Sequence, residues 1–266
     1  MAQFDTITCV TDLGNEDESV GLLQSILHEL SPTSKVIDLC HDIKPGDIRA
    51  GALMLARSVP YLSPGLVLAS VGDLAGRPAI AVSVGEGQSI LVGPDNGLLG
   101  AAVAVVGGAS QAVQLTNQDL HNSSPGVTHP ARDIIAPVVG HVAAGGSLLE
   151  LGQEIEPALL LPSLVPVPRT ETDGAISAEV IRRTRQGAAQ LNIDRDTLSG
   201  FGDVIILEFG DDRRVVRIQH PDEVNPGQLA LVDDEYGLLA IATGQQEGVV
   251  PDELAVGAEV MLREAT

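Results

Sequence analysis

PALLLPSLVPVPRT, residues 157–170, holds four prolines in a short space. It separates two parts of the chain that differ in their pattern of predicted helices and strands. Proline fixes the backbone angle φ and has no N–H to donate, so this run is expected to form a semi-rigid linker. A chain of 266 residues is also long enough for two domains. The sequence therefore predicts a first domain over 1–160, a linker over 161–171 and a second domain over 172–266.

Before the linker, strand-like and helix-like segments alternate. TITCVT (6–11) is a β-branched run that precedes a segment with helical apolar spacing at 19–30. In the same way, KVIDLC (35–40) precedes a predicted helix at 47–59. Further strands are predicted at 66–71, 79–84 and 89–93, and further helices at 96–106 and 131–145. Such alternation is typical of an α/β domain with a mostly parallel sheet that helices cover on both faces.

Beyond the linker, the chain consists of short β-rich pieces separated by Gly, Asp, Asn and Pro. The pieces are GAISAEVIR, DVIILEF, RRVVRIQ, QLALVD, LLAIAT and AEVMLR. They indicate a smaller all-β domain, either a barrel or a sandwich. The predicted fold class is thus α/β, with an N-terminal α/β domain followed by a barrel-like all-β domain.

The composition narrows the possible partners. The formal net charge is −21, and only 15 residues are Lys or Arg, so the surface should repel nucleic-acid phosphates and anionic lipids. We therefore expect no nucleic-acid partner and no membrane attachment, whereas a cationic small molecule would be weakly attracted. Cys9 and Cys40 lie in strand-like runs behind an N-terminus that does not read as a secretory leader. The predicted location is cytoplasmic, without a disulfide.

Polar side chains follow several of the predicted strands, at the point where each strand ends. In open α/β sheets, ligands bind beyond the carboxyl ends of the strands, so these side chains are candidates for one polar-substrate site. The candidates are Asp12, His41, Asp42, Asp73, Arg77, Asp95, Asn96, His129, Arg132 and Asp133.

Each candidate also has a plain structural interpretation. An isolated Asp such as Asp12 or Asp95 often serves a turn or caps a helix. His41 could be a hydrogen-bonded loop histidine, and Arg132 with Asp133 could form a surface pair at a helix start. The sequence holds no P-loop, no GxSxG motif and no zinc-type Cys and His spacing, so we expect no metal site.

Four motifs follow one another along the first predicted domain. They are TDLGNEDESVG (11–21), VIDLCHDIKPGDIRAGALMLARSVPYL (36–62), VGPDNGLL (92–99) and HPARDIIAP (129–137). Their residues and their order along the chain resemble the motifs of the S-adenosylmethionine hydroxide adenosyltransferase family, the hydrolytic relatives of fluorinases and chlorinases. The PDNGLL and RDIIAP matches are the specific ones, and the β-rich tail is similar to that family's smaller C-terminal domain.

The resemblance implies attack of water or hydroxide on C5′ of S-adenosylmethionine, which releases adenosine and methionine. It assigns activation of the water to Asp73, Arg77 and His129, with Asp73 orienting Arg77, and contact with the ribose hydroxyls to Asp12. Asp95, Asn96, Arg132 and Asp133 complete the predicted substrate-binding set. A sulfonium is a good leaving group, so the reaction needs neither a general acid nor a cofactor. The resemblance also implies a homotrimer.

The chain departs from the family pattern at several places, and this leaves two functions open. The loop from Asp73 to Arg77 is shorter than the family's, and one residue is added between His129 and Asp133. In the tail, the stretch 184–188 keeps only the glycine of the family's motif, without its Phe and Asn, and the stretch 235–242 also departs from the family's motif. The protein is either an active hydrolase or a non-catalytic homologue that binds a nucleoside or a partner. Halogenation has little support, because nothing in the sequence marks a small dry halide pocket.

Overall fold

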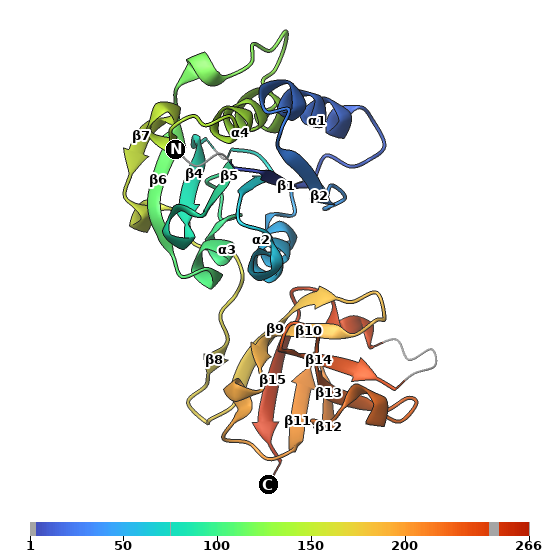
Figure 1. The fold of residues 1–266 in the computed structure, drawn as a ribbon. Coiled ribbons are helices and arrows are strands. Elements are labelled where there is room, and N and C mark those ends of the chain that lie inside the picture. Colours follow the sequence, from blue (N-terminus) through green and yellow to red (C-terminus); the bar gives the residue numbers. More distant parts are fainter. Residues whose placement is uncertain (1–3, 75, 245–249, 266) are drawn as a thin grey trace. The chain divides into compact units, whose positions relative to one another are not determined.

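The computed structural model describes residues 4–74, 76–244 and 250–265. It divides into two compact units, one ending at Val165 and the other beginning at Pro166. Figure 1 shows that the first unit combines a sheet with helices and that the second consists mainly of strands. The predicted fold class, an α/β domain followed by a barrel-like all-β domain, is confirmed.

The first unit is built on a seven-stranded sheet with strand order β2-β1-β3-β5-β4-β6-β7. The strands are β1 (Thr6–Thr11), β2 (Lys35–Cys40), β3 (Leu66–Ser70), β4 (Ala79–Val84), β5 (Ser89–Pro94), β6 (Ala109–Leu115) and β7 (Gly152–Ile155). β1 pairs in parallel with β2 and β3, and β3 pairs in parallel with β5. β4 instead runs antiparallel to both of its neighbours. The few residues between β4 and β5 allow a hairpin but are too short for a parallel crossover.

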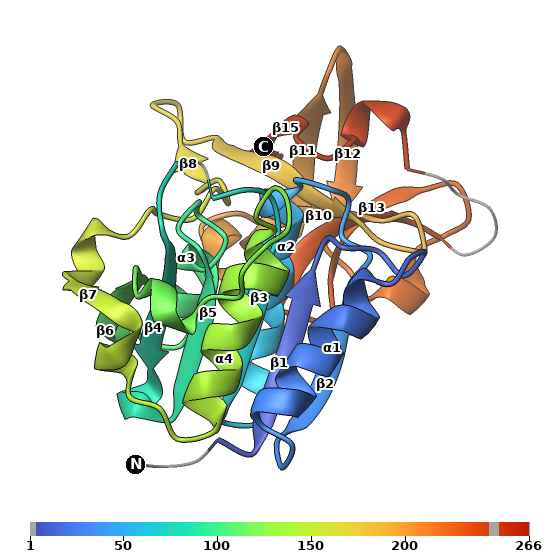
Figure 2. The same cartoon turned by 90° about the horizontal axis from the view of Figure 1, so that it is seen from above.

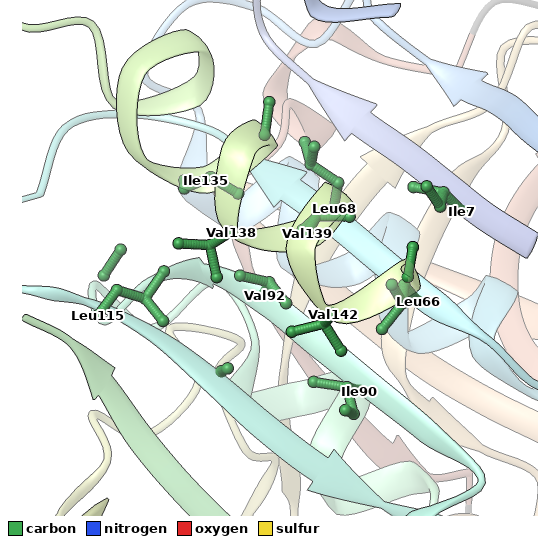
Figure 3. Close-up of a cluster of buried hydrophobic side chains, with 14 of the residues drawn as sticks. Ile7, Leu66, Leu68, Ile90, Val92, Leu115, Ile135, Val138, Val139 and Val142 are labelled. Carbon is green, nitrogen blue, oxygen red and sulfur yellow. The ribbon is translucent and has the colours of Figure 1, made fainter. Parts of the chain in front are cut away.

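Helices cover both faces of this sheet (Figure 2). They are α1 (Ser19–Leu30), α2 (Ile48–Ser58), α3 (Gly100–Val105) and α4 (Ala136–Ala143), the last preceded by a π-helical turn over Pro130–Ile135. α1 and α4 share one apolar core with one face of the sheet, and α2 and α3 share another core with the opposite face. In Figure 3, Val138, Val139 and Val142 of α4 lie over Leu66 and Val92 of the sheet.

The second unit is an antiparallel sheet with strand order β12-β11-β15-β9-β10-β14-β13, and β8 pairs with β9. The strands are β8 (Arg169–Thr170), β9 (Ile176–Arg183), β10 (Ala189–Asp194), β11 (Val204–Phe209), β12 (Asp212–Arg217), β13 (Leu229–Asp233), β14 (Leu238–Thr243) and β15 (Glu259–Glu264). A bridge between Ile218 and Leu231 links the region after β12 to β13, so the sheet curls into a nearly closed barrel. Phe209 is among the largest side chains buried inside it.

In the described ranges, no helix is long and apolar enough to cross a bilayer. Both cysteines are free thiols. Cys9 lies on β1 and is wholly buried. This burial, together with the nearby charge of Asp38, raises the pKa of the Cys9 thiol to about 12.

We expect Cys9 to resist iodoacetamide in the folded protein at pH 8, because only the thiolate reacts and the sulfur is inaccessible. Peptide mass spectrometry should find Cys9 unmodified in buffer and fully modified in denaturant. Cys40, which is only partly buried, serves as the internal comparison. Equal labelling of the two thiols in the folded protein would contradict the buried position of Cys9.

Candidate functional site

The carboxyl ends of β1, β3 and β5 lie at one edge of the first unit's sheet, and Asp12 ties the loops there together. Its Oδ2 atom accepts hydrogen bonds from the backbone N–H of Gly46, at 2.8 Å, and of Gly72, at 2.9 Å. These glycines belong to the loops that follow β2 and β3, and both have a positive φ, 75° and 72°, which glycine adopts without strain. Asp12 thereby sets the relative position of the two loops.

Asn96 fixes the loop after β3 from the other side. Its side-chain amide donates to the carbonyls of Val71 and Asp73, both at 3.0 Å, and its Oδ1 accepts from the N–H of Leu98 at 3.2 Å. The side chain is only 5% exposed. The structure therefore gives the Asn96 amide a backbone-bracing role, and it holds the main chain at Asp73, whose side chain is exposed.

Arg77 forms an ion pair with Asp95 across the same edge. Its Nε donates to Oδ2 of Asp95 at 2.7 Å, and its Nη2 donates to the same oxygen. The other carboxylate oxygen, Oδ1, accepts from the N–H of Leu161 at 2.9 Å. Asp95 is 2% exposed, whereas the Arg77 side chain is 39% exposed. Asp73 is thus not the sole carboxylate available to orient Arg77, because the buried Asp95 bonds to it directly.

His129, Arg132 and Asp133 form the third cluster, at the π-helical turn. The carboxylate of Asp133, 2% exposed, accepts from the backbone N–H of His129 at 2.7 Å and from Nε and Nη2 of Arg132 at 2.6 and 2.9 Å. The bonds from Arg132 hold the pKa of Asp133 below its usual value and raise the pKa of Arg132. Turns of this type often occur at functional sites. Here the turn holds His129 by its main chain and leaves that residue exposed.

His129 and Arg132 face a small cavity of about 70 Å³ beside the loop after β1. Its other lining residues are Leu13, Glu18, Ser19, Leu22 and Leu23. A cavity needs only about 10–15 Å³ of such space to hold a water molecule, so this one can hold the attacking water. The lining residues in the described ranges do not include Arg77 or Asp73. The structure therefore brings His129 and Arg132 together, whereas Arg77 and Asp95 form a separate cluster.

Other positions are clear as well. His41 is buried, its Nδ1 lies 2.8 Å from Oγ1 of Thr11, and its Nε2 lies 3.0 Å from Oδ1 of Asp38. This matches the interpretation of His41 as a hydrogen-bonded loop histidine. Asp42 accepts from the Asn15 amide at 2.8 Å. Glu18 and Ser19 line the cavity at His129 and belong to the motif at 11–21, although the sequence did not mark them as candidates. In the described ranges, no three His, Cys, Asp or Glu side chains gather in a way that could hold a metal ion.

We expect Asp133→Asn to lower the free energy of unfolding by roughly 1.5–3 kcal/mol at pH 7, the range for hydrogen bonds to a charged group. Because the folded-state pKa of Asp133 is lowered, its stabilising effect is present above the ordinary aspartate pKa of about 3.9 and is lost as the pH falls through the folded-state value. Urea unfolding should therefore show a difference between wild type and variant that narrows below about pH 4. Asp119→Asn, at an exposed position, is the control. A difference that stays constant down to pH 2 would count against the pairing.

Comparisons with known proteins show what this chain is similar to. A family model described as the SAM hydroxide adenosyltransferase N-terminal domain matches residues 7–152. An (R)-S-adenosyl-L-methionine hydrolase from Salinispora tropica is 38% identical over 242 residues, 91% of each chain. A fluorinase from Actinopolyspora mzabensis is 24% identical over 250 residues, 85% of this chain and 81% of that one.

The fold has a solved counterpart. The crystal structure of an uncharacterized conserved protein from Thermotoga maritima matches with a TM-score of 0.81 at 24% identity, covering 96% of this chain and 99% of that chain. The family model spans more than half of the 266 residues, and the Salinispora hydrolase is similar over most of the chain. The chain belongs to the S-adenosylmethionine hydroxide adenosyltransferase family.

Proposed function

We propose that the protein hydrolyses S-adenosyl-L-methionine to adenosine and L-methionine. The observation that carries the proposal is the presentation of His129, held by the buried Asp133 and its partner Arg132, at a cavity of about 70 Å³. The cavity lies next to Leu13, the residue after Asp12, and is large enough for the attacking water. The 38% identical relative from Salinispora tropica, which bears the name of this hydrolase, supports the same activity.

In the proposed reaction, a water oxygen forms a bond to C5′ while the bond from C5′ to sulfur breaks. The sulfur keeps the bonding electrons and leaves as the neutral thioether of methionine. The water loses one proton, which the His129 imidazole accepts and passes to solvent. Since the sulfonium is a good leaving group, the protein has only to hold and polarise the water in line with the C5′–S bond. The reaction so written uses no cofactor and no metal.

The remaining roles follow from position and charge. Arg132 brings guanidinium N–H donors to the cavity that His129 faces. Arg77 with Asp73, on the loop after β3, completes the proposed catalytic set. Asp12, whose Oδ2 is held by two backbone N–H groups, is the proposed contact for the ribose hydroxyls. Asn96 braces this loop, and it is proposed to shape the binding site.

Hydrolysis is preferred over two other functions. Halogenation would require a dry halide pocket, whereas the cavity at His129 is bordered by Glu18, Ser19 and Arg132, and the fluorinase relative is only 24% identical. A non-catalytic nucleoside-binding homologue would keep the fold but release no adenosine. The activity measurement below separates this alternative from the enzyme.

The assembly and location belong to the proposal too. We expect a homotrimer on the ground of the family resemblance alone. We also expect a cytoplasmic location and no nucleic-acid partner, in line with the net charge of −21 and the free thiols. Light scattering at micromolar concentration should give three times the monomer mass of 27.6 kDa. A clean monomer mass would refute the trimer.

We expect His129→Ala and Arg77→Ala each to lower kcat by roughly 100-fold, the scale for losing an acid–base or charge-stabilising group. Asp12→Ala should raise KM more than it lowers kcat, because a ribose contact is made in the ground state and the transition state alike. Chromatography of released adenosine provides both constants. His28→Ala, at an exposed position in the last turn of α1, is the matched histidine control and should behave as wild type. Wild-type protein that binds S-adenosylmethionine without releasing adenosine would establish the binding homologue instead.

A further inference from the structure

Asp95 has its carboxylate oxygens committed to partners inside the protein. Oδ2 accepts both bonds from Arg77, and Oδ1 accepts from the N–H of Leu161. The residue is 2% exposed, so a substrate at the sheet edge has almost no access to it. An ionised carboxylate at such depth is stable only with charged or strongly directed donors. The geometry therefore argues against the substrate-binding role that the sequence predicted for Asp95.

Arg77, the charged partner of Asp95, has fewer contacts with the rest of the protein. The backbone N–H of Arg77 donates to the carbonyl of Leu74 at 2.9 Å, which closes the short turn after β3. Its side chain is 39% exposed, and besides the bonds to Asp95 it reaches the carbonyl of Leu159 at 3.5 Å. A long arginine side chain in this position has many rotamers available in water. Asp95 is the group that selects one of them.

The same two side chains also hold the segment Leu159–Leu161. Arg77 donates to the carbonyl of Leu159, and Asp95 accepts from the N–H of Leu161. We use the name clasp for Arg77, Asp95 and the backbone of Leu159–Leu161. Just beyond it, the chain lies directly on the turn that leads to α3. A Cβ added to Gly100 would lie 2.6 Å from the backbone N of Ser163, and one added to Gly97 would lie 2.9 Å from the carbonyl O of Pro162.

The packing of the segment Leu159–Leu161 against α3 is incomplete. An apolar cavity of about 200 Å³ lies between α3 and the segment, lined among others by Val103 and Leu160. The pocket is partly open to solvent, so the side chains that line it have fewer packing partners than side chains in a filled core. The polar contacts of the clasp therefore add to this packing in holding Leu159–Leu161 at the sheet edge.

We infer that Asp95 is a positioning residue, which holds the Arg77 guanidinium in place for the reaction and joins it to the segment Leu159–Leu161. The catalytic part of this inference rests on the proposed hydrolysis, whereas the pairing itself does not. The segment ends four residues before the first unit does at Val165, so the clasp also fixes the point from which the chain leaves that unit.

The first test is a mutant cycle with Asp95→Asn, Arg77→Ala and the double variant. Asparagine has the shape of aspartate and can still accept from Leu161, but it has no charge for Arg77. We expect Asp95→Asn to lower kcat about 10-fold or more, the effect of losing a charge-assisted hydrogen bond, with a smaller change in KM. In the Arg77→Ala background, Asp95→Asn should have no further effect on kcat. An equal loss in both backgrounds would overturn the inference, because it would mean that Asp95 acts independently of Arg77.

Chemical rescue separates positioning from a general loss of structure. Guanidinium ion added at millimolar concentration should restore part of the rate of Arg77→Ala, because the Asp95 carboxylate remains to bind it. It should not restore the rate of the double variant. Rescue of both variants to the same extent would again overturn the role of Asp95. Glu150→Gln removes a carboxylate that bonds His141 and the N–H of Ser147 in the same unit, and it should leave kcat unchanged.

A readout without catalysis distinguishes failure of this inference from failure of the proposed function. The 15N–1H signal of the Arg77 Nε group should exchange slowly with water in the wild type and rapidly in Asp95→Asn. In Asp95→Ala, the Leu161 amide should also lose its protection. If the wild type releases no adenosine but these signals respond, the hydrolase proposal fails and the pairing stands. If the signals do not respond, the positioning role is excluded whatever the activity.

Discussion

The need to satisfy buried carboxylates organises the functional edge of this protein. Taking an ionised carboxylate out of water costs several kcal/mol unless donors replace the lost hydration. Asp95 and Asp133 are each 2% exposed, and each draws its donors from an arginine and from a backbone N–H. Asp12 uses the N–H groups of two different loops. The loops therefore adopt positions that bring these donors to the carboxylates.

The hydrogen bonds of these carboxylates fix the positions of the side chains at the sheet edge. A side chain with two or three partners has few rotamers left, so its orientation is settled before a ligand arrives, which is the condition for efficient electrostatic catalysis. The arrangement at His129 illustrates the point, because the main chain of His129 is bonded in both directions to Asp133. With its main chain fixed in this way, His129 lines the cavity.

The sequence predicted the two-part architecture well, because apolar periodicity and proline content are local properties. It missed β6 and β7, since β6 mixes polar residues with small ones in ASQAVQL and β7 is a short, half-exposed edge strand. The helix predicted over 96–106 begins only at Gly100. Before it, the side chain of Asn96 accepts a hydrogen bond from the N–H of Leu98 and stabilises a turn. The motifs predicted candidate residues that lie at one edge of the sheet, but they could not reveal the partners of those residues. Asp95 finds Arg77 18 residues away and Leu161 66 residues away, distances that only the tertiary fold spans.

The pairing of arginines with buried carboxylates also bears on the charge of the proposed substrate. S-adenosylmethionine carries a positive sulfonium, and a bare arginine beside it would repel it. Arg77 with Asp95 and Arg132 with Asp133 each form a pair without net charge, yet the N–H groups of each arginine remain directed donors. A neutral pair can orient a water or a substrate oxygen without opposing the approach of a cation. On a chain with a net charge of −21, such pairs keep the long-range field attractive while supplying local hydrogen-bond donors. The same buried carboxylates thus reconcile an arginine-containing site with a cationic substrate.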